Sequence, residues 1–274
     1  GGATRGYANK GSFPRANSLQ SRPEFSLNDL SSNNFIVYKF MQSLNIFSTP
    51  EEMAEEIARR WHRGAKMAAK VQGVFSVTLS GGATPLKVYK KMASPLWVNK
   101  IPWDAVHIFW TDERCVPPES EESNYQTICR AFLNHVPIPE KNVHRIKGEE
   151  EPEKESIRYA KEIKDHMMVR NGQNIFFDWV LLGLGIDGHT ASLFPGQEDF
   201  LKTSNLCEVA KHPETNQTRI TLTPAAIQRS ACVTYHVTGQ KKAEIVSELV
   251  LKPEENKKYP AANILGEWYL DEAA

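Results

Sequence analysis

One glycine-rich loop in the sequence pairs an acid with a histidine. Residues 183–190 read Gly-Leu-Gly-Ile-Asp-Gly-His-Thr and directly follow the apolar residues 180–182. A histidine exchanges protons near neutral pH and can act as a general base. A carboxylate two residues away is placed to orient the imidazole or to stabilise its charged form. A lone histidine is more often structural, so it is the loop context that predicts a proton-transfer pair of Asp187 and His189.

The same loop contains the spacing G-x-G-x-x-G, with Glu208 at a distance that suits a ribose contact. In a dinucleotide-binding fold a helix follows the third glycine. Here Pro195 would interrupt that helix, and Phe194-Pro195-Gly196 is typical of a turn. We therefore expect no dinucleotide site.

A second glycine-rich segment, Ser-Gly-Gly-Ala-Thr-Pro at 80–85, has the features of a phosphate site. Gly81 and Gly82 let the backbone approach a ligand closely, and a helix start offers free N–H groups to an anion. Thr84 followed by Pro85 is typical of an N-cap and a first-turn proline. The Walker A lysine is missing, so nucleotide hydrolysis is not expected. Taken alone, the segment is equally well explained as a tight turn.

Charged side chains supply the remaining candidates. Thr111-Asp112-Glu113-Arg114 follows the apolar residues 108–110, and Arg114 can bind an anion through two parallel hydrogen bonds. Alone, this group is equally well explained as an ion-pair cluster. Lys242 begins a helix after a strand, where the helix dipole favours anions, and Arg219 lies in a β-rich stretch. Each of these two cations, taken alone, is more simply a surface charge.

The elements that must position these residues alternate between strands and helices. Strands are predicted at residues 35–40, 75–80, 105–110, 176–182 and 231–237. Helices are predicted at residues 49–72, 84–92, 125–135, 153–171 and 240–251. This alternation favours an α/β fold with a mostly parallel sheet. Ligands of such sheets bind beyond the carboxyl ends of the strands, so each loop after a strand is a candidate wall of one site.

Residues 1–33 are rich in Gly, Ser, Asn and Arg and show no apolar period. They predict a flexible N-terminal tail, with one folded domain over residues 34–274. A linker cut from a fusion, an organelle transit remnant and residues added in cloning all remain open for this tail. No apolar core of a signal peptide is recognised in it.

Composition excludes several classes of protein. The 274 residues include 33 basic and 33 acidic side chains, a net charge of zero, which argues against a nucleic-acid binder. No apolar run is long enough to span a membrane. The four cysteines lack CxxC spacing and the eight histidines lack an HExxH motif. We therefore expect free thiols in a reducing cytoplasm and no metal site.

Six segments together resemble the 6-phosphogluconolactonase family. They are LSGGATPLKVY, FWTDERCVPPESEESNY, LLGLGIDGHTASLFPG, RITLT, VTGQKKA and EWYLDEAA. They occur in the order found in the family and extend over about residues 35–274. Each segment is weak evidence alone, whereas the set is highly specific. The wider superfamily includes glucosamine-6-phosphate deaminases, which share the GG-x-TP and D-G-H loops.

The resemblance implies a Rossmann-like, mostly parallel sheet flanked by helices, with a smaller lobe closing the cleft. It implies hydrolysis of 6-phospho-D-glucono-1,5-lactone to 6-phospho-D-gluconate in the oxidative pentose phosphate pathway, with no cofactor and no metal. The expected partner is this small phosphosugar lactone, with no nucleic acid and no membrane, in the cytoplasm. Because some family members are fused to glucose-6-phosphate dehydrogenase, fusion to or association with that enzyme is a further expectation.

The resemblance also assigns roles to residues. The binding group comprises Gly81, Gly82, Thr84, Asp112, Arg219 and Lys242, with the last two at the phosphate. The catalytic group comprises His189, Asp187 and Arg114. His189 would take a proton from water as it attacks the lactone carbonyl and return it to the departing ring oxygen. Arg114 would stabilise either the oxyanion or the charge of the substrate, and the sequence does not divide these roles.

Two rival functions are disfavoured by single residues. In the deaminases the D-G-H loop continues as F-N-E-P-G, and the glutamate takes part in acid–base catalysis. Here Phe194 holds that position and cannot move a proton, and Arg114 stands where the deaminases have tyrosine. A catalytically silent sugar-phosphate sensor would have lost His189 or Asp187, and both are present.

Overall fold

The computed structural model describes residues 43–170, 172–251 and 255–274, so the predicted tail at 1–33 and the predicted strand at 35–40 lie outside the described residues. The main sheet has seven parallel strands in the order β1-β12-β11-β8-β2-β3-β5. In chain order these are β1 (Leu44–Phe47), β2 (Phe75–Leu79), β3 (Val106–Trp110), β5 (Val143–His144), β8 (Trp179–Leu182), β11 (Val233–Val237) and β12 (Glu267–Asp271). The predicted fold class is confirmed.

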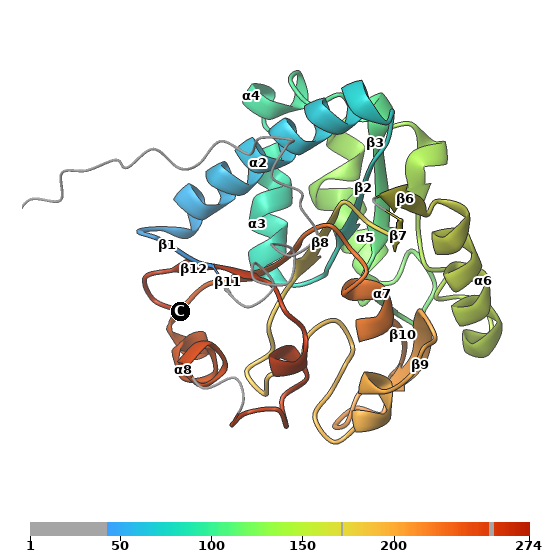
Figure 1. The fold of residues 1–274 in the computed structure, drawn as a ribbon, viewed down its shortest axis with the longest axis vertical. Coiled ribbons are helices and arrows are strands. Elements are labelled where there is room, and N and C mark those ends of the chain that lie inside the picture. The colour runs from blue at the N-terminus through green and yellow to red at the C-terminus, as the bar shows by residue number, and fades with distance from the viewer. Residues whose placement is uncertain (1–42, 171, 252–254) are drawn as a thin grey trace, which may run out of the picture. The chain divides into compact units, whose positions relative to one another are not determined.

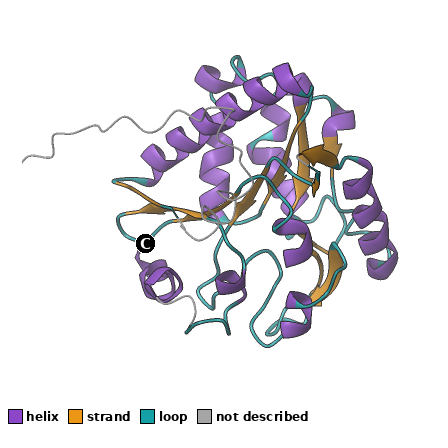
Figure 2. Ribbon diagram, viewed as in Figure 1, coloured by secondary structure: helices purple, strands orange, loops and turns teal. Residues whose placement is uncertain are grey.

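Helices cover the sheet (Figures 1 and 2). They are α2 (Pro50–Val71), α3 (Ala83–Met92), α4 (Pro95–Val98), α5 (Asn124–Ala131), α6 (Pro152–Asp165), α7 (Pro224–Ile227) and α8 (Ala243–Leu251). Every residue of β2, β8 and β11 is buried. Such continuous burial is typical of parallel strands with both faces covered, which explains why all residues of these segments except Ser76 and His236 are apolar or β-branched.

The strand order reverses between β2 and β8. From β2 the chain adds β3 and β5 on one side, and it then places β8, β11 and β12 on the other. Loops that leave two such neighbouring strands diverge, and the crevice between them is where ligands bind in open α/β sheets. The two loops lie side by side here, because a Cβ atom placed on Gly183 would be 4.0 Å from the carbonyl oxygen of Gly81.

A smaller antiparallel sheet accompanies the main one and corresponds to the predicted smaller lobe. Its strands are β4 (Asp112–Arg114), β10 (Thr218–Leu222) and β9 (Cys207–Lys211), in the order β4-β10-β9. Strands β9 and β10 pack against α6. A separate two-stranded hairpin consists of β6 (Met168–Arg170) and β7 (Gln173–Ile175).

The first long helix begins as predicted, whereas the next helix does not. Thr49 caps α2 by accepting a hydrogen bond from the backbone N–H of Glu52 at 3.1 Å. The prediction that Thr84 caps α3 is wrong: the helix starts at Ala83, and its N-cap is Gly82 with φ +103°. Glycine reaches this conformation without the steric cost that a Cβ atom brings. The cap therefore precedes the position that the Thr-Pro pair indicated.

Two predicted helices extend too far. The helix predicted over 153–171 ends at Asp165, and residues 168–175 form the β6–β7 hairpin, which turns at Gly172 with φ +73°. Cross-strand pairing there outweighs helix propensity. The helix predicted over 125–135 ends as α5 at Ala131, and a separate 3-10 turn follows at Leu133–His135.

Two further predictions can be compared with the structure. All four cysteines are free, as expected. Among the helices in the described ranges, none has the length and apolar character needed to cross a membrane.

Candidate active site

The acid and the histidine of the loop after β8 contact each other directly. His189 Nδ1 lies 2.6 Å from Asp187 Oδ1, and the backbone N–H of His189 donates to the same oxygen at 3.2 Å. The backbone N–H of Gly185 closes the loop on the carbonyl of His189 at 2.8 Å. A Cβ atom on Gly185 would lie 2.1 Å from His189 Nδ1, so the loop needs glycine there. The side chains are 30% exposed for His189 and 45% for Asp187, which leaves both open to a ligand.

The charge state of Asp187 fixes the roles of the imidazole nitrogens. Burial opposes ionisation of Asp187, but the hydrogen bond and charge of His189 outweigh it and hold the pKa of Asp187 at about 2. The carboxylate is therefore ionised at neutral pH and can only accept hydrogen bonds. His189 must then donate through Nδ1, and Nε2 is left as the nitrogen that can take up a proton.

Lys242 lies beside this pair. Its ammonium group donates to the carbonyl of Leu184 at 2.6 Å, and burial lowers its pKa while the charge of Asp187 opposes that change. Lys242 ends the 3-10 turn Gln240–Lys242, which follows β11. The Asp271 carboxylate fixes the start of this turn by accepting from the backbone N–H of Gly239 at 2.9 and 3.2 Å. The turn therefore brings a cation to the loop after β8.

In the loop after β2, Gly81 lies too close to Asn124 to carry a side chain. A Cβ atom on Gly81 would lie 2.1 Å from Asn124 Oδ1. The hydroxyl of Thr84 is 2.8 Å from that of Thr238, which ties the first turn of α3 to the loop after β11. Because Gly82 has no capping side chain, the first N–H groups of α3 stay available to an anion at the switch point of the sheet.

The two candidate arginines are cross-strand neighbours. Arg114 on β4 is opposite Arg219 on β10. Burial lowers the pKa of Arg219, and the charge of Arg114 lowers it further. Nε of Arg114 is buried without a hydrogen-bond partner among the described residues, although its guanidinium donates to the carbonyl of Glu122. An anion bound between the two guanidinium groups would relieve their repulsion.

The Asp112 carboxylate contacts Arg219 indirectly, through the hydroxyl of Ser192. It is 5% exposed, and its carboxylate accepts from the hydroxyls of Thr111 at 3.1 Å and Ser192 at 2.6 Å. Arg219 in turn donates to the hydroxyl of Ser192 at 3.5 Å. The structure thus places Asp112 next to a residue that contacts Arg219, rather than at the open surface of the site.

The Phe194 ring contacts both His189 and Arg219. Its ring centroid is 5.0 Å from that of His189, and the guanidinium of Arg219 lies 5.5 Å above the same ring. The ring is 1% exposed. The position at which the deaminases have their glutamate therefore holds a buried apolar side chain, and it brings His189 and Arg219 to one place.

Sequence reasoning missed several residues around the site. His212 packs against Phe194 with 5.0 Å between ring centroids, and Thr238 contacts Thr84. His212 belongs to no recognisable pattern, whereas Thr238 lies in the VTGQKKA segment, from which only Lys242 was selected. Glu113 had a signal, because it lies in the Thr-Asp-Glu-Arg segment: its buried carboxylate accepts from the backbone N–H groups of Asn124 and Tyr125, both at 2.7 Å. It thereby holds the start of α5, and with it Asn124, against the loop after β2.

These features define a class of protein. It is a doubly wound α/β protein with an acid–histidine pair on the loop after β8, at the switch point of the sheet. As the position of Pro195 predicted, no helix follows the third glycine of this loop, since residues 183–197 contain none.

Comparison with known proteins identifies the family. The sequence model of the glucosamine-6-phosphate isomerases/6-phosphogluconolactonase family matches residues 48–269, and the chain belongs to this family. It is 41% identical over 233 residues to 6-phosphogluconolactonase from Haemophilus influenzae, covering 83% of this chain and 96% of that protein. The crystal structure of the devB protein has a TM-score of 0.79 at 40% identity and covers 85% of this chain and 98% of that one.

A further relative has two parts. The GDH/6PGL endoplasmic bifunctional protein of Oryctolagus cuniculus is 33% identical over 246 residues, which is 85% of this chain and 30% of that protein. This chain is thus similar to one portion of a larger bifunctional protein.

Proposed function

We propose that the chain hydrolyses 6-phospho-D-glucono-1,5-lactone to 6-phospho-D-gluconate in the oxidative pentose phosphate pathway. The observation that carries this proposal is the 2.6 Å contact of His189 with Asp187 at an open position beside Lys242. Arg219 lies against the Phe194 ring that His189 also contacts. The relatives named 6-phosphogluconolactonase support the choice of substrate. A buried Phe194 at the acid–base position of the deaminases disfavours the rival reaction.

In the proposed reaction His189 is the only acid–base group that must move a proton. Nε2 of His189 takes a proton from water while the water oxygen forms a bond to C1 of the lactone. The imidazolium that results is stabilised by the Asp187 carboxylate. The bond from C1 to the ring oxygen then breaks, and Nε2 returns the proton to that oxygen. An intramolecular ester is activated enough for water attack, so the step requires no covalent nucleophile.

The binding residues divide between two ends of the substrate. We propose that Gly81, Gly82 and Thr84 line the phosphate or sugar end, with Lys242 and Arg219 on the phosphate and Arg114 on the oxyanion or the substrate charge. Asp112 then acts through Ser192, as a residue that positions Arg219.

The test is hydrolysis of freshly generated lactone, coupled to 6-phosphogluconate dehydrogenase and corrected for spontaneous ring opening. We expect acceleration by the wild type and loss of nearly all of it in His189→Asn. His135→Gln is the matched control, because His135 is exposed and hydrogen-bonds only locally, to the carbonyl of Arg130. Equal acceleration by His189→Asn keeps the function and removes His189 as the base. A folded wild type without acceleration refutes the function, and glucosamine 6-phosphate is then the next substrate to assay.

We further propose a reducing, cytoplasmic setting and an association with glucose-6-phosphate dehydrogenase, the enzyme that makes the substrate. The free thiols support the first. The existence of a bifunctional relative supports the second. Microscopy of the tagged chain tests the location, and co-purification with the dehydrogenase, compared with a mixture of both enzymes at matched activity, tests the association.

A further inference from the structure

Three histidines from different elements meet on the other side of β3 from β2. His107 is the second residue of β3, His144 ends β5, and His166 follows the last turn of α6. Each can offer one ring nitrogen such that the three nitrogens lie within 4.8 Å of one another. The ring centroids of His144 and His166 are 4.2 Å apart, and those of His107 and His144 are 5.2 Å apart. None of these residues belongs to the candidate active site.

Two of these imidazoles are oriented by oxygen acceptors behind them. His144 Nδ1 lies 2.8 Å from the carboxylate of Glu162, and His166 Nδ1 lies 2.9 Å from the backbone carbonyl of the same residue. The ionised carboxylate and the carbonyl oxygen can only accept, so each Nδ1 carries a proton and each Nε2 has a lone pair. That of His144 accepts a hydrogen bond from His107 Nδ1 at 3.0 Å, and a bound ion would displace this proton. Metal-binding histidines typically show this arrangement, in which an outer carboxylate or carbonyl fixes the tautomer.

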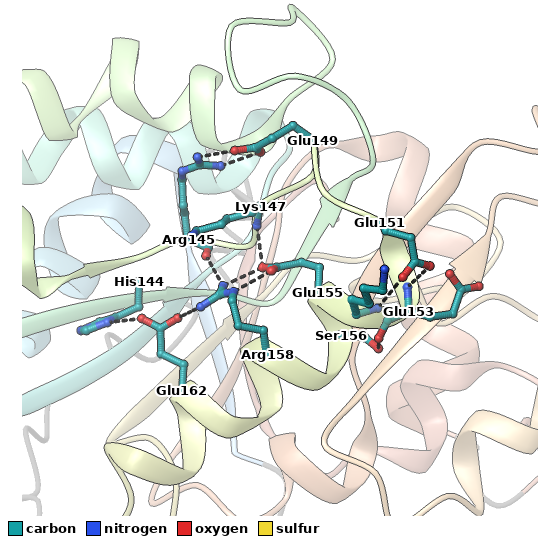
Figure 3. A network of polar contacts seen from close by, with 11 residues as sticks. His144, Arg145, Lys147, Glu149, Glu151, Glu153, Glu155, Ser156, Arg158 and Glu162 are labelled. Atoms are coloured by element: carbon teal, nitrogen blue, oxygen red, sulfur yellow. Dashed lines mark hydrogen bonds and ion pairs between the residues drawn. The ribbon is translucent and has the colours of Figure 1, made fainter.

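The outer carboxylate is itself held in place. Figure 3 shows Glu162 between His144 and Arg158, with which it forms an ion pair, and Arg158 also pairs with Glu155 at 2.6 Å. The contacts with His144 at 2.8 Å and with Arg158 hold the Glu162 carboxylate behind the His144 ring.

The spacing of the ring nitrogens suits one small ion. His107 Nδ1 is 3.0 Å from His144 Nε2. Two imidazole nitrogens on a tetrahedral zinc ion, with Zn–N bonds of about 2.0–2.1 Å, are separated by roughly 3.4 Å. The observed separations, from 3.0 Å to at most 4.8 Å, bracket this value, so rotations of the side chains suffice to bring three nitrogens to one centre.

We propose that His107, His144 and His166 bind one transition-metal ion of the imidazole-preferring class, with Zn²⁺ as its representative. Three nitrogen ligands leave a fourth position for water. The ion would tie the edge strand β5 and the end of α6 to β3. It would lie away from the loops that follow β2 and β8, so it takes no part in lactone hydrolysis. No spacing motif predicts this site, because each ligand comes from a separate element.

Binding of Zn²⁺ to the full chain tests the proposal. Metal is first removed with a chelator, and Zn²⁺ is then titrated in competition with a chromogenic chelator, with the absorption spectrum of Co²⁺ as a second readout. We expect one equivalent to bind to the wild type and to the control His135→Gln. His107→Gln and His166→Gln should each weaken binding at least tenfold, and Glu162→Gln should weaken it about 10- to 100-fold through the outer contact.

Two controls keep this test decisive. Lactone hydrolysis by His107→Gln and His166→Gln should equal that of the wild type and so report that both variants fold. Saturating Zn²⁺ should raise the Tm of the wild type and of His135→Gln, but not that of the two ligand variants. The proposal is overturned if the wild type binds no more Zn²⁺ than the ligand variants. It is also overturned if His189→Asn abolishes binding while His107→Gln and His166→Gln retain it, because the ion then sits at the catalytic pair.

Discussion

Replacing Asp187 with asparagine tests whether the acid that contacts His189 contributes to its action as the base. The change keeps the size of the side chain and removes its charge. In the wild type the carboxylate accepts from His189 Nδ1 at 2.6 Å and from the backbone N–H of His189 at 3.2 Å. Both bonds end on Oδ1, so asparagine keeps them only while its carbonyl faces His189, and without the charge. With its amide group facing the ring instead, it favours the wrong tautomer of the imidazole. We expect kcat to fall and KM to change little, because Asp187 acts on the reacting proton and not on the phosphate.

The structure sets the size of this loss. The pKa of Asp187 falls from 3.8 to about 2, and at about 1.4 kcal/mol per unit the gross preference for the charged pair is roughly 2.5 kcal/mol. The carboxylate is 45% exposed, so solvent screening leaves about 1 kcal/mol of it, which is roughly a five- to tenfold effect on rate. Loss of the correct tautomer adds to this, and we expect kcat to fall about 10- to 100-fold.

The coupled lactonase assay measures this loss at saturating substrate between pH 5 and 8. Because the pKa of Asp187 is lowered to about 2, its carboxylate is ionised across this range, so the loss reports removal of the charge and not titration of Asp187. Asp165→Asn is the matched control, since Asp165 is exposed and pairs only with Lys161 on the same helix. A kcat of Asp187→Asn within twofold of the wild type would refute the role given to this contact.

Three further predictions concern other parts of the site and fold. Arg114→Ala should lower kcat more than Arg219→Ala does, whereas Arg219→Ala should mainly raise KM. Steady-state kinetics of the two variants measure these effects, and identical changes in kcat and KM would contradict the separate roles proposed for the two arginines. Gly81→Ala should lower Tm and activity together, because the new Cβ would lie 2.1 Å from Asn124 Oδ1, and an unchanged melting curve would show that Asn124 moves freely. Glu162→Gln should remove about 2 kcal/mol of unfolding free energy at pH 7. The lowered pKa of Glu162 means that this contribution is present above pH 4.5 and is lost as the pH falls toward 2, so urea unfolding of metal-free wild type and variant should converge at low pH.

The parallel core of the fold could be predicted from sequence because its signal is local. The segments at 75–80, 105–110 and 231–237 are short, apolar and bounded by turn residues, and each forms a buried strand within two residues of the predicted limits. The strands of the antiparallel sheet were not predicted, because the family resemblance implied a smaller lobe but placed no strand in it. Its strand β4 has only three residues, all charged, and such a strand is defined by its partners rather than by its own hydrophobic pattern.

The candidate site shows the same division between local and long-range information. The Asp187–His189 contact spans two residues, so the sequence could place it. The juxtaposition of Arg114 with Arg219 depends on the register of β4 and β10, and no periodicity encodes pairing over such a separation. The cap of α3 was misplaced for a different reason: Thr-Pro has the chemistry of an N-cap, but the conformation of Gly82 at φ +103° starts the helix earlier.

The position of β1 in the sheet has a consequence for how the protein folds during synthesis. Among the strands that the structure describes, β1 pairs with β12 alone, and Asn45 contacts Trp268 across a separation of 223 residues. At about 5–20 residues per second, a ribosome needs roughly 10 to 45 seconds to make the intervening chain. Throughout that interval β1 has exposed backbone hydrogen-bonding groups and no strand to pair with. We therefore expect this edge of the sheet to form last and to be where nascent chains are most open to chaperones and proteases.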